Sequence, residues 1–273
     1  MSELVTLKSD SQIAMMRRAG AIVAEMLART SAAVRPGITT GELDRIAAQI
    51  LTEHGAESSF LGYYGYPATI CTSVNEEIVH GIPGKRKLRE GDIIGIDAGA
   101  VVDGWHADGA VTVPVGRVSE AATALIRTTQ EALERGIAAA KPGGRLGDIG
   151  ALVQGLAERN GFSVVRNYVG HGIGRAMHEP PQVPNFGTAG QGRPVGVGLC
   201  IAIEPMLNAG DTGTRLLDDG WTVVTADGSL SAHFEHTVAV TAEGPVVLTL
   251  PGDPPGDPGL AKAAARRPAG ARR

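Results

Sequence analysis

The chain has 273 residues, of which 43% are hydrophobic and 20% are charged, and this is long enough to bury one large core. Its formal net charge of −4 gives no reason to expect specific nucleic-acid binding. The two cysteines, Cys71 and Cys200, form no C-x-x-C pair, which argues against a disulfide framework and a thiolate zinc site and favours a reducing compartment.

Helical patterns with recognisable caps occupy four stretches of the chain. Before the first of them, Met1-Ser2-Glu3-Leu4 lacks a basic region followed by an apolar run, so no secretion signal is expected. No stretch of about 18 apolar residues occurs, which argues against a membrane span and leaves the cytoplasm as the expected location. We expect helices at 9–33 or 10–33, 39–54, 119–140 and 146–160.

Apolar and β-branched runs fill most of the remaining sequence. A Gly/Pro-rich loop is expected at 184–198. Together with the helices, the strands predict an α+β fold. We expect them at about 67–74, 92–102, 105–115, 163–169, 199–207, 221–226 and 230–240.

The dipeptide Asp103-Gly104 is the one expected at a two-residue type I′ hairpin turn. Such a turn fixes the register of the flanking strands and places Asp97 opposite Ala110. Asp97 and Asp108 are then diagonal neighbours on one face of the hairpin, about 7–8 Å apart at the backbone. Two short acidic side chains at that separation can bind one ion, or two ions that share a bridge.

The second half of the chain repeats the first. The helical pattern at 37–55 recurs at 143–161, an offset of 106, and the strand pattern at 91–97 recurs at 198–204, an offset of 107. The last residue of the strand pattern is a carboxylate each time. We therefore expect a pocket at the pseudo-symmetric centre of two α-α-β-β halves. The halves would span about 10–115 and 119–250 within a single domain at 1–250.

Five residues of types that bind metals well lie in apolar or Gly-rich runs: Asp97, Asp108, His171, Glu204 and Glu235. A carboxylate flanked by β-formers, as in the run that ends at Glu204, points toward a core. An unpaired charge there would cost roughly several kcal/mol unless a cation neutralises it. The sequence therefore predicts a buried cation site.

Four motifs stand out in the sequence: GHGIGRAMHEPP at 170–181, IEPM at 203–206, FEHT at 234–237 and VHGIP at 79–83. They resemble motifs of the bacterial type I methionine aminopeptidases, and the resemblance extends over about residues 4–250. It implies a metallopeptidase of the pita-bread fold, with duplicated halves and an antiparallel sheet. The implied activity is removal of the initiator Met from nascent proteins with a small second residue.

The resemblance also implies a dinuclear metal centre. Asp97 corresponds to the terminal carboxylate on one metal, Asp108 and Glu235 to bridges, and His171 with Glu204 to the shell of the other metal. Two divalent cations would balance four carboxylates, so the centre could be buried. Ions about 3.5–4 Å apart can hold a hydroxide that attacks the scissile carbonyl. The ligand types do not choose among cobalt, manganese, iron and zinc.

By the same resemblance, His80, His178 and Glu204 are the expected catalytic side chains. Glu204 would move a proton, and the two histidines would hydrogen-bond the peptide group and the developing oxyanion. The substrate's amino group would bind at the metal beside Asp97. The residues that match substrate-binding positions are Phe60, Tyr63, Tyr66, Cys71, His80, Met177, His178 and Trp221.

The matching residues form a pocket only as a set, because core packing is the first explanation for any one of them. Sulfur-containing walls suit the thioether of a methionine substrate. Two positions depart from the family pattern: Met177 stands where Phe is usual, and Tyr64 stands where many bacterial members carry His. Pocket width and peptide contacts are therefore expected to differ.

The sequence leaves two alternatives to this function. A proline dipeptidase of the same fold is the enzymatic rival, although its members usually carry a further N-terminal domain. A non-catalytic pita-bread module would bind peptides or ribosomes without metal, and the complete ligand set argues against it. Expected partners are peptides and nascent chains with N-terminal Met. A transient ribosome contact is left open, and a monomer that binds no membrane and no specific nucleic acid is expected.

The two ends of the chain carry their own expectations. Residues 251–273 are rich in Pro, Gly, Ala and Arg with a net charge of +3, which predicts a disordered tail. A solvated extension is favoured over a contact with ribosomal RNA, so deletion of the tail should leave turnover intact. Residue Ser2 is small, so the mature chain is expected to begin there.

Overall fold

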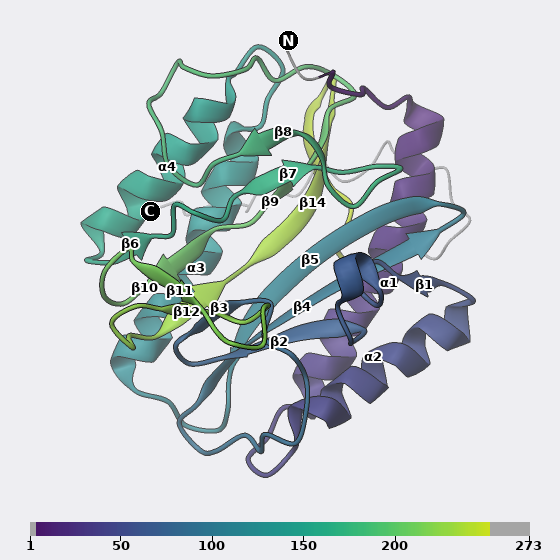
Figure 1. The fold of residues 1–273 in the computed structure, drawn as a ribbon. Coiled ribbons are helices and arrows are strands. Elements are labelled where there is room, and N and C mark those ends of the chain that lie inside the picture. The colour runs from purple at the N-terminus through teal and green to yellow at the C-terminus, as the bar shows by residue number, and fades with distance from the viewer. Residues whose placement is uncertain (1–3, 252–273) are drawn as a thin grey trace, which may run out of the picture.

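The computed structural model describes residues 4–251, in which four helices flank a central antiparallel sheet (Figure 1). Each helix lies within one residue of its predicted bounds, and Ser9 and Thr39 form capping boxes with Gln12 and Glu42 at the first two N-termini. The predicted α+β class is therefore confirmed. The helices are α1 (Asp10–Ala33), α2 (Thr40–His54), α3 (Glu120–Ala139) and α4 (Leu146–Arg159).

The central sheet has nine strands, and its main path runs in the order β1-β4-β5-β14-β9-β7-β8. Strand β2 pairs with β4 at one side of this path, and β15 pairs with β14. The nine strands are β1 (Glu57–Ser58), β2 (Ile70–Val74), β4 (Ile93–Val102), β5 (Trp105–Pro114), β7 (Gly170–Gly172), β8 (Glu179–Val183), β9 (Cys200–Ile203), β14 (Glu235–Thr241) and β15 (Gly244–Val247).

Two sheets of three strands each accompany the central sheet, in the orders β13-β10-β6 and β11-β12-β3. A short 3₁₀ helix, η1 (Tyr63–Gly65), lies between β1 and β2 in the chain. The strands of the small sheets are β3 (Glu77–Val79), β6 (Ser163–Val164), β10 (Met206–Asn208), β11 (Thr214–Leu216), β12 (Val223–Thr225) and β13 (Ser231–His233).

The duplication predicted from the sequence is visible in the centre of the main sheet. Strands β4 and β9, which carry the repeated strand pattern, flank the inner pair β5 and β14. In the view of Figure 1, helices α1 and α2 lie at the right, near β4 and β5, and helices α3 and α4 lie at the left, beyond β9 and β14. The seam between the inner strands is short, because only Ala110 with Glu235 and Gly109 with His236 pair across it.

The β4–β5 hairpin has the predicted turn and register. Asp103 and Gly104 both have positive φ, at 51° and 73°, as a type I′ turn requires. Asp97 pairs with Ala110, and Asp108 pairs with Gly99. No register shift interrupts the ten pairs between these strands, so the diagonal placement of the two aspartates is confirmed.

Three predicted strands are wrong in extent. The stretch 199–207 divides because β9 ends before Glu204-Pro205, and Pro205 has no N–H to donate to a sheet. The chain then enters a different sheet as β10. The stretch 230–240 divides in the same way at Phe234, between β13 and β14. Of the stretch 163–169, only Ser163–Val164 is a strand.

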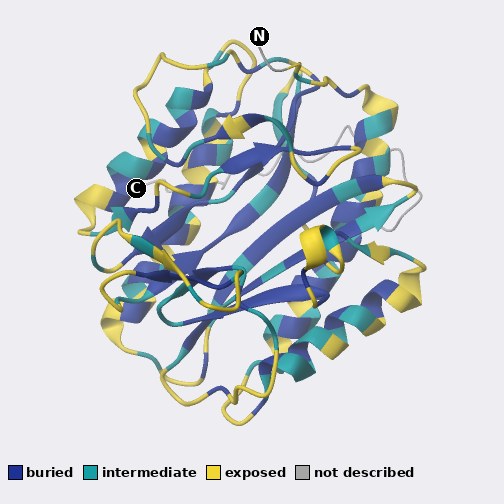
Figure 2. Cartoon of the chain, viewed as in Figure 1, coloured by how far each residue is buried: buried dark blue, intermediate teal, exposed yellow. Residues whose placement is uncertain are grey.

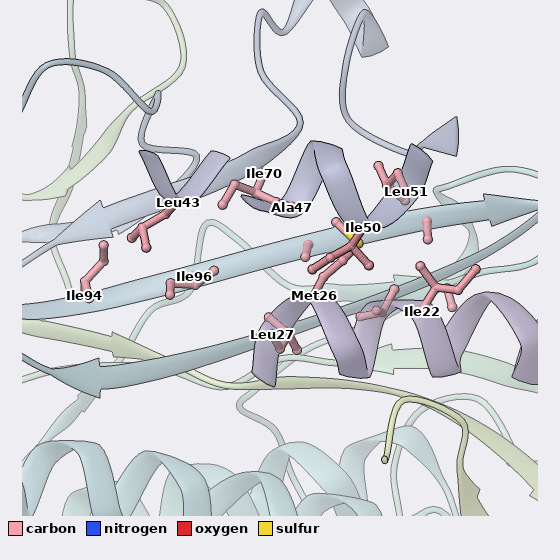
Figure 3. Packing of buried hydrophobic residues seen from close by; sticks show 14 of the residues in the cluster. Ile22, Met26, Leu27, Leu43, Ala47, Ile50, Leu51, Ile70, Ile94 and Ile96 are labelled. Atoms are coloured by element: carbon pink, nitrogen blue, oxygen red, sulfur yellow. The ribbon is translucent and has the colours of Figure 1, made fainter. Parts of the chain in front are cut away.

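The apolar faces of α1 and α2 pack on the first half of the sheet. Ile22, Met26 and Leu27 of α1 meet Leu43 and Ile50 of α2 in one cluster that also contains Ile94 and Ile96 of β4 (Figure 3). Each such side chain contributes about 1.5–3 kcal/mol when fully buried. Figure 2 shows buried residues along most of the central strands and mixed burial along the helices. This packing holds β4 and β5 as a rigid platform.

Two expectations concern residues at the chain ends. The start at Ser2 and, apart from Pro251, the predicted tail at 251–273 lie outside the residues that the structure describes. Within residues 4–251, none of the helices has the length and apolar character needed to cross a bilayer.

Candidate metal centre and substrate pocket

Three of the five predicted metal ligands lie in one row across the middle of the sheet, with Ala110 between two of them. Ala110 of β5 pairs on one side with Asp97 of β4 and on the other side with Glu235 of β14. Glu204 comes directly after β9, and one further step of the β14–β9 register sets it opposite Glu235. Residues in one such row share a face of the sheet, so these carboxylates converge above the methyl group of Ala110.

Asp108 and His171 complete the cluster from neighbouring positions. Asp108 lies two residues from Ala110 on β5 and so faces the same way. The Nε2 atom of His171, on β7, lies 4.0 Å from Asp108 Oδ2 and 3.5 Å from Glu204 Oε1. One ligand atom from each of Asp108, His171 and Glu235 lies within 4.8 Å of the others. The five residues predicted from the sequence thus come together.

The orientation of His171 suits a metal ligand. Its Nδ1 lies 2.9 Å from the carbonyl oxygen of Gly172. Since a carbonyl can only accept, Nδ1 must carry the proton, and the lone pair of Nε2 then faces the carboxylates. A backbone partner of this kind is the usual support for a metal-binding histidine.

The electrostatics of the cluster call for a cation. Burial raises the pKa of Asp97 to about 7, and burial with mutual repulsion raises the pKa values of Asp108, Glu204 and Glu235 well above their ordinary range. Burial also lowers the pKa of His171 to about 3. Asp97 Oδ1 and Glu235 Oε1 are buried and have no hydrogen-bond partner among the described residues. Oxygen donors with one neutral imidazole fit a divalent metal.

A cavity of about 400 Å³ lies over this cluster. Every residue predicted to bind substrate or metal lines it, and the aromatic and sulfur-containing side chains lie on its walls. Cavities of this size, largely apolar with a few convergent polar groups, are typical of small-molecule binding sites. The predicted substrate residues among the lining are Phe60, Tyr63, Tyr66, Cys71, His80, Met177, His178 and Trp221.

The two predicted catalytic histidines have specific neighbours in the cavity. The ring of His178 lies 4.1 Å from that of His171, and its Nδ1 lies 2.8 Å from the hydroxyl of Tyr63. His80 has a positive φ of 62° and its ring meets those of Tyr168 and Trp221 edge to face. Burial lowers the pKa values of both histidines, to about 4 for His80. Both are therefore neutral at pH 7 and able to donate or accept one hydrogen bond.

Five lining residues were not among the predicted site residues: Tyr64, Val79, Tyr168, Val169 and His233. Tyr64, one of the two departures from the family pattern, is 86% exposed. His233 is buried, and its Nε2 has no hydrogen-bond partner within residues 4–251 and lies 3.9 Å from Glu235 Oε2. The usable signal in the sequence was its position directly before the motif Phe234-Glu235-His236-Thr237. Nothing in the sequence pattern around Tyr168 and Val169 pointed to a pocket.

Comparisons with known proteins agree with this geometry. The model of metallopeptidase family M24 matches residues 14–242. The chain is 53% identical over 247 residues to a methionine aminopeptidase of Clostridium perfringens, covering 90% of this chain and 99% of that protein. It is 48% identical over 246 residues to methionine aminopeptidase 1 of Bacillus subtilis, with 90% and 99% covered.

Solved structures give the same result. A methionine aminopeptidase from Rickettsia prowazekii superposes with a TM-score of 0.89 at 42% identity and covers 90% of this chain and 100% of its own. A prolidase from Pyrococcus horikoshii has a TM-score of 0.72 at 21% identity, which shows a shared fold alone, and the match spans 90% of this chain and 64% of that one. The pita-bread fold implied by the sequence resemblance is confirmed.

Proposed function

This chain belongs to metallopeptidase family M24, and from that premise we propose that it is a metal-dependent methionyl aminopeptidase that removes N-terminal Met before a small second residue. The observation that carries the proposal is the convergence of four carboxylates and His171 beneath a cavity lined by sulfur and aromatic groups. Relatives named methionine aminopeptidase are 44–53% identical over most of the chain.

The proposed cofactor is a pair of divalent ions. Asp97, Asp108 and Glu235 would hold one ion, and Asp108, Glu235, His171 and Glu204 the other, with the two shared carboxylates as bridges. Four carboxylates match the charge of two divalent cations. Such ions would act as Lewis acids toward the scissile carbonyl and would make water nucleophilic near neutral pH. Cobalt, manganese, iron and zinc all fit these donors, and metal analysis of the purified protein distinguishes them.

The chain's own residues are proposed to orient the substrate. His178 Nδ1 is engaged by the Tyr63 hydroxyl, which leaves Nε2 as the atom available to the peptide group. His80 presents its neutral ring to the cavity beside Trp221. Glu204 lies next to His171 and is the proposed proton carrier. Phe60, Tyr66, Cys71, Met177 and Trp221 would enclose the methionine side chain and exclude water from it.

We further propose that residues 1–250 act as one catalytic domain. A hydrophobic cluster that joins Val111 of the first half to Ile201 and Val238 of the second supports this. The proposed substrates are Met-initiated peptides and nascent chains, handled by a cytoplasmic monomer. The basic tail is the proposed place for any transient ribosome contact.

Turnover of Met-Ala-Ser against an X-Pro dipeptide tests the function. We expect the metal-loaded protein to cleave the Met peptide with a kcat/KM at least about a hundredfold higher, since a pocket chosen for side-chain shape and chemistry discriminates by this order. Preference for the X-Pro dipeptide would instead establish the prolidase alternative. Absence of both activities in metal-loaded protein would favour the non-catalytic module.

A further inference from the structure

A buried ion pair joins the segment before α1 to strand β8. Lys8 Nζ lies 2.6 Å from Glu179 Oε2, and the two side chains are 1% and 13% exposed. Lys8 Nζ also donates to the carbonyl oxygen of Thr6 at 3.1 Å. Because the desolvation of a buried pair offsets much of its attraction, such a pair is weak evidence for a purely stabilising role. The other contacts of Glu179 indicate a different role.

The second oxygen of Glu179 holds a turn. Glu179 Oε1 accepts the backbone N–H groups of Arg175 at 2.8 Å and Ala176 at 3.2 Å. A Cβ added to Gly174 would lie 2.5 Å from Lys8 Cε and 2.7 Å from Glu179 Oε1. A side chain at residue 174 would therefore displace the ends of the lysine and the carboxylate from the turn. The carboxylate of Glu179 thus connects Lys8 to the backbone of residues 174–176.

This turn leads into Met177 and His178, which line the cavity and lie directly before Glu179. Its outer side is fastened to the β4–β5 hairpin, because His106 N–H donates to the carbonyl of Gly174 at 2.9 Å. The Arg175 guanidinium lies 4.1 Å from the ring centroid of Trp105. The turn is therefore held both by contacts with the hairpin and by hydrogen bonds to Glu179.

The backbone of Lys8 is itself anchored. Its N–H donates to the carbonyl oxygen of Gly198 at 2.7 Å. Gly198 has a φ of +88°, and a Cβ at this position would lie 2.7 Å from the carbonyl oxygen of Lys8. The segment before α1 is thus seated against the loop that precedes β9. Lys8 does not line the cavity, so any effect on catalysis must pass through Glu179 and the turn.

We propose that Lys8 is a positioning residue, which acts through Glu179 to set the turn 174–178 and thereby the placement of His178 and Met177 in the pocket. The inference rests on the proposed function and adds to it a contribution from the segment before α1. Lys8 and Glu179 are 171 residues apart in the chain. Replacement of Lys8 is therefore expected to change kcat/KM, although Lys8 contacts neither the substrate nor the four carboxylates and the imidazole of the proposed metal centre.

The test compares Lys8→Met and Lys8→Arg in the full-length, metal-loaded protein. Lys8→Met should lower kcat/KM for Met-Ala-Ser by about ten- to hundredfold, the range seen when a supporting partner of a functional side chain is lost. Metal content per chain should stay unchanged, and Lys8→Arg should restore activity to within about threefold because it keeps the charge-assisted hydrogen bond. Arg29→Met, which removes the exposed pair with Glu53, is the matched control and should have no effect.

Two mutant cycles separate positioning from a general loss of structure. Glu179→Gln keeps an oxygen for the turn, so it should reduce kcat/KM less than Lys8→Met, and the double variant should be no worse than Lys8→Met alone. In a His178→Ala background, Lys8→Met should lower kcat/KM by less than about threefold, since its effect runs mainly through His178. An undiminished loss in that background, or wild-type activity of Lys8→Met, overturns the inference.

The variant Glu179→Gln keeps the inference testable if Lys8→Met does not fold. If Lys8→Met does not fold, then the comparison of Glu179→Gln with wild type at matched thermal stability decides the question, with unchanged kcat/KM as the contrary result. An inactive wild-type protein on Met-Ala-Ser would instead reject the proposed function. The two failures are therefore distinguishable.

Discussion

The two halves of the molecule bring their buried carboxylates to one face of the sheet by different backbones. In the first half, Asp97 and Asp108 lie on an uninterrupted hairpin of two ten-residue strands. In the second half, Glu204 follows the four-residue strand β9, and Glu235 begins β14 directly after the break at Phe234. The comparison teaches that a duplicated fold can conserve where a ligand lies without conserving how the chain reaches it.

The difference has a physical origin in what each half must also build. The hairpin stays within one sheet and holds two of the carboxylates on one face, so a regular register suffices. The second half sends β10 and β13 into a separate sheet, where they pair with each other beside the cavity. The breaks at Pro205 and Phe234 let one segment serve both sheets. Breaks of this kind re-aim side chains, as bulges do next to active sites.

The largest expected effect comes from replacing one proposed metal ligand in each half of the molecule. Asp108→Asn on the hairpin and Glu204→Gln at the strand end should each lower kcat/KM for Met-Ala-Ser by about a thousandfold or more, since each disturbs metal-assisted chemistry worth several kcal/mol. Asp103→Asn at the exposed hairpin turn is the control and should retain activity. A large loss from only one ligand would show that the halves do not share the centre equally.

Metal removal should reverse the usual pH dependence of stability. The raised pKa values of the four carboxylates mean that the folded metal-free protein keeps protons which the unfolded chain releases, so this contribution makes the unfolding free energy fall as pH rises. The lowered pKa values of buried histidines such as His171 act in the opposite direction, but only below their ordinary value of 6.5. Above it, the carboxylates dominate.

The measurement follows from that sign. The Tm of chelator-treated protein should fall by several degrees between about pH 6.5 and pH 8, at roughly 2–4 °C per kcal/mol for a chain of this size. Protein loaded with manganese should change less, because bound cations hold the carboxylates ionised. A Tm that rises with pH in the metal-free sample would contradict the assigned cluster.

A matched pair of glycines tests the symmetry of the halves directly. Gly37 and Gly143 occupy equivalent turns with φ of +92° and +86°, and neither has a neighbour within 4 Å of an added Cβ. Alanine at either position should reduce the free energy of unfolding by about 1–2 kcal/mol, the strain of a positive φ. Urea denaturation should give equal losses within about 0.5 kcal/mol, and Gly196→Ala, without positive φ, should be close to neutral. Unequal losses would mean that the halves match in topology only.

The smallest expected effect concerns the pocket wall. Met177→Phe exchanges a flexible thioether for a rigid ring in the cavity, so the KM for Met-Ala-Ser should change by about two- to fivefold, with kcat nearly constant. Met26→Leu is the control, because Met26 is buried in α1 and does not line the cavity. An unchanged KM would remove Met177 from the substrate contacts.

The predictability of the site follows the same division between the halves. Counting from Asp103-Gly104 was enough to pair Asp97 with Ala110, because a two-residue turn fixes every later pair. In the second half, no comparable two-residue turn joins β9 to β14, so the register of these strands could not be counted from the sequence. Its stretches at 199–207 and 230–240 read as continuous strands, although Pro205 is a local signal for a break, because the pairing of β10 and β13 in a separate sheet is not contained in a local pattern. Strand β8 was missed because Pro180 and Pro181 inside it argue locally against a strand.

Residues whose contacts come only from the tertiary fold were harder to predict than carboxylates in apolar runs. The ligands stood out because a carboxylate in an apolar run needs a partner. His233 gave a weaker signal, and Lys8 gave none, because a lysine before a helix is ordinarily solvated. Only the three-dimensional contact with Glu179 supports the positioning role that we propose for it.

The short seam between β5 and β14 has a practical consequence. Two residue pairs and the Thr237 hydroxyl, which bonds both the N–H and the carbonyl of Asp108, join the inner strands there. Each half alone carries an incomplete set of donors. A chain severed at 116–118 should therefore yield fragments whose reassembly depends on added metal, and the split protein could serve as a reporter of free divalent ions.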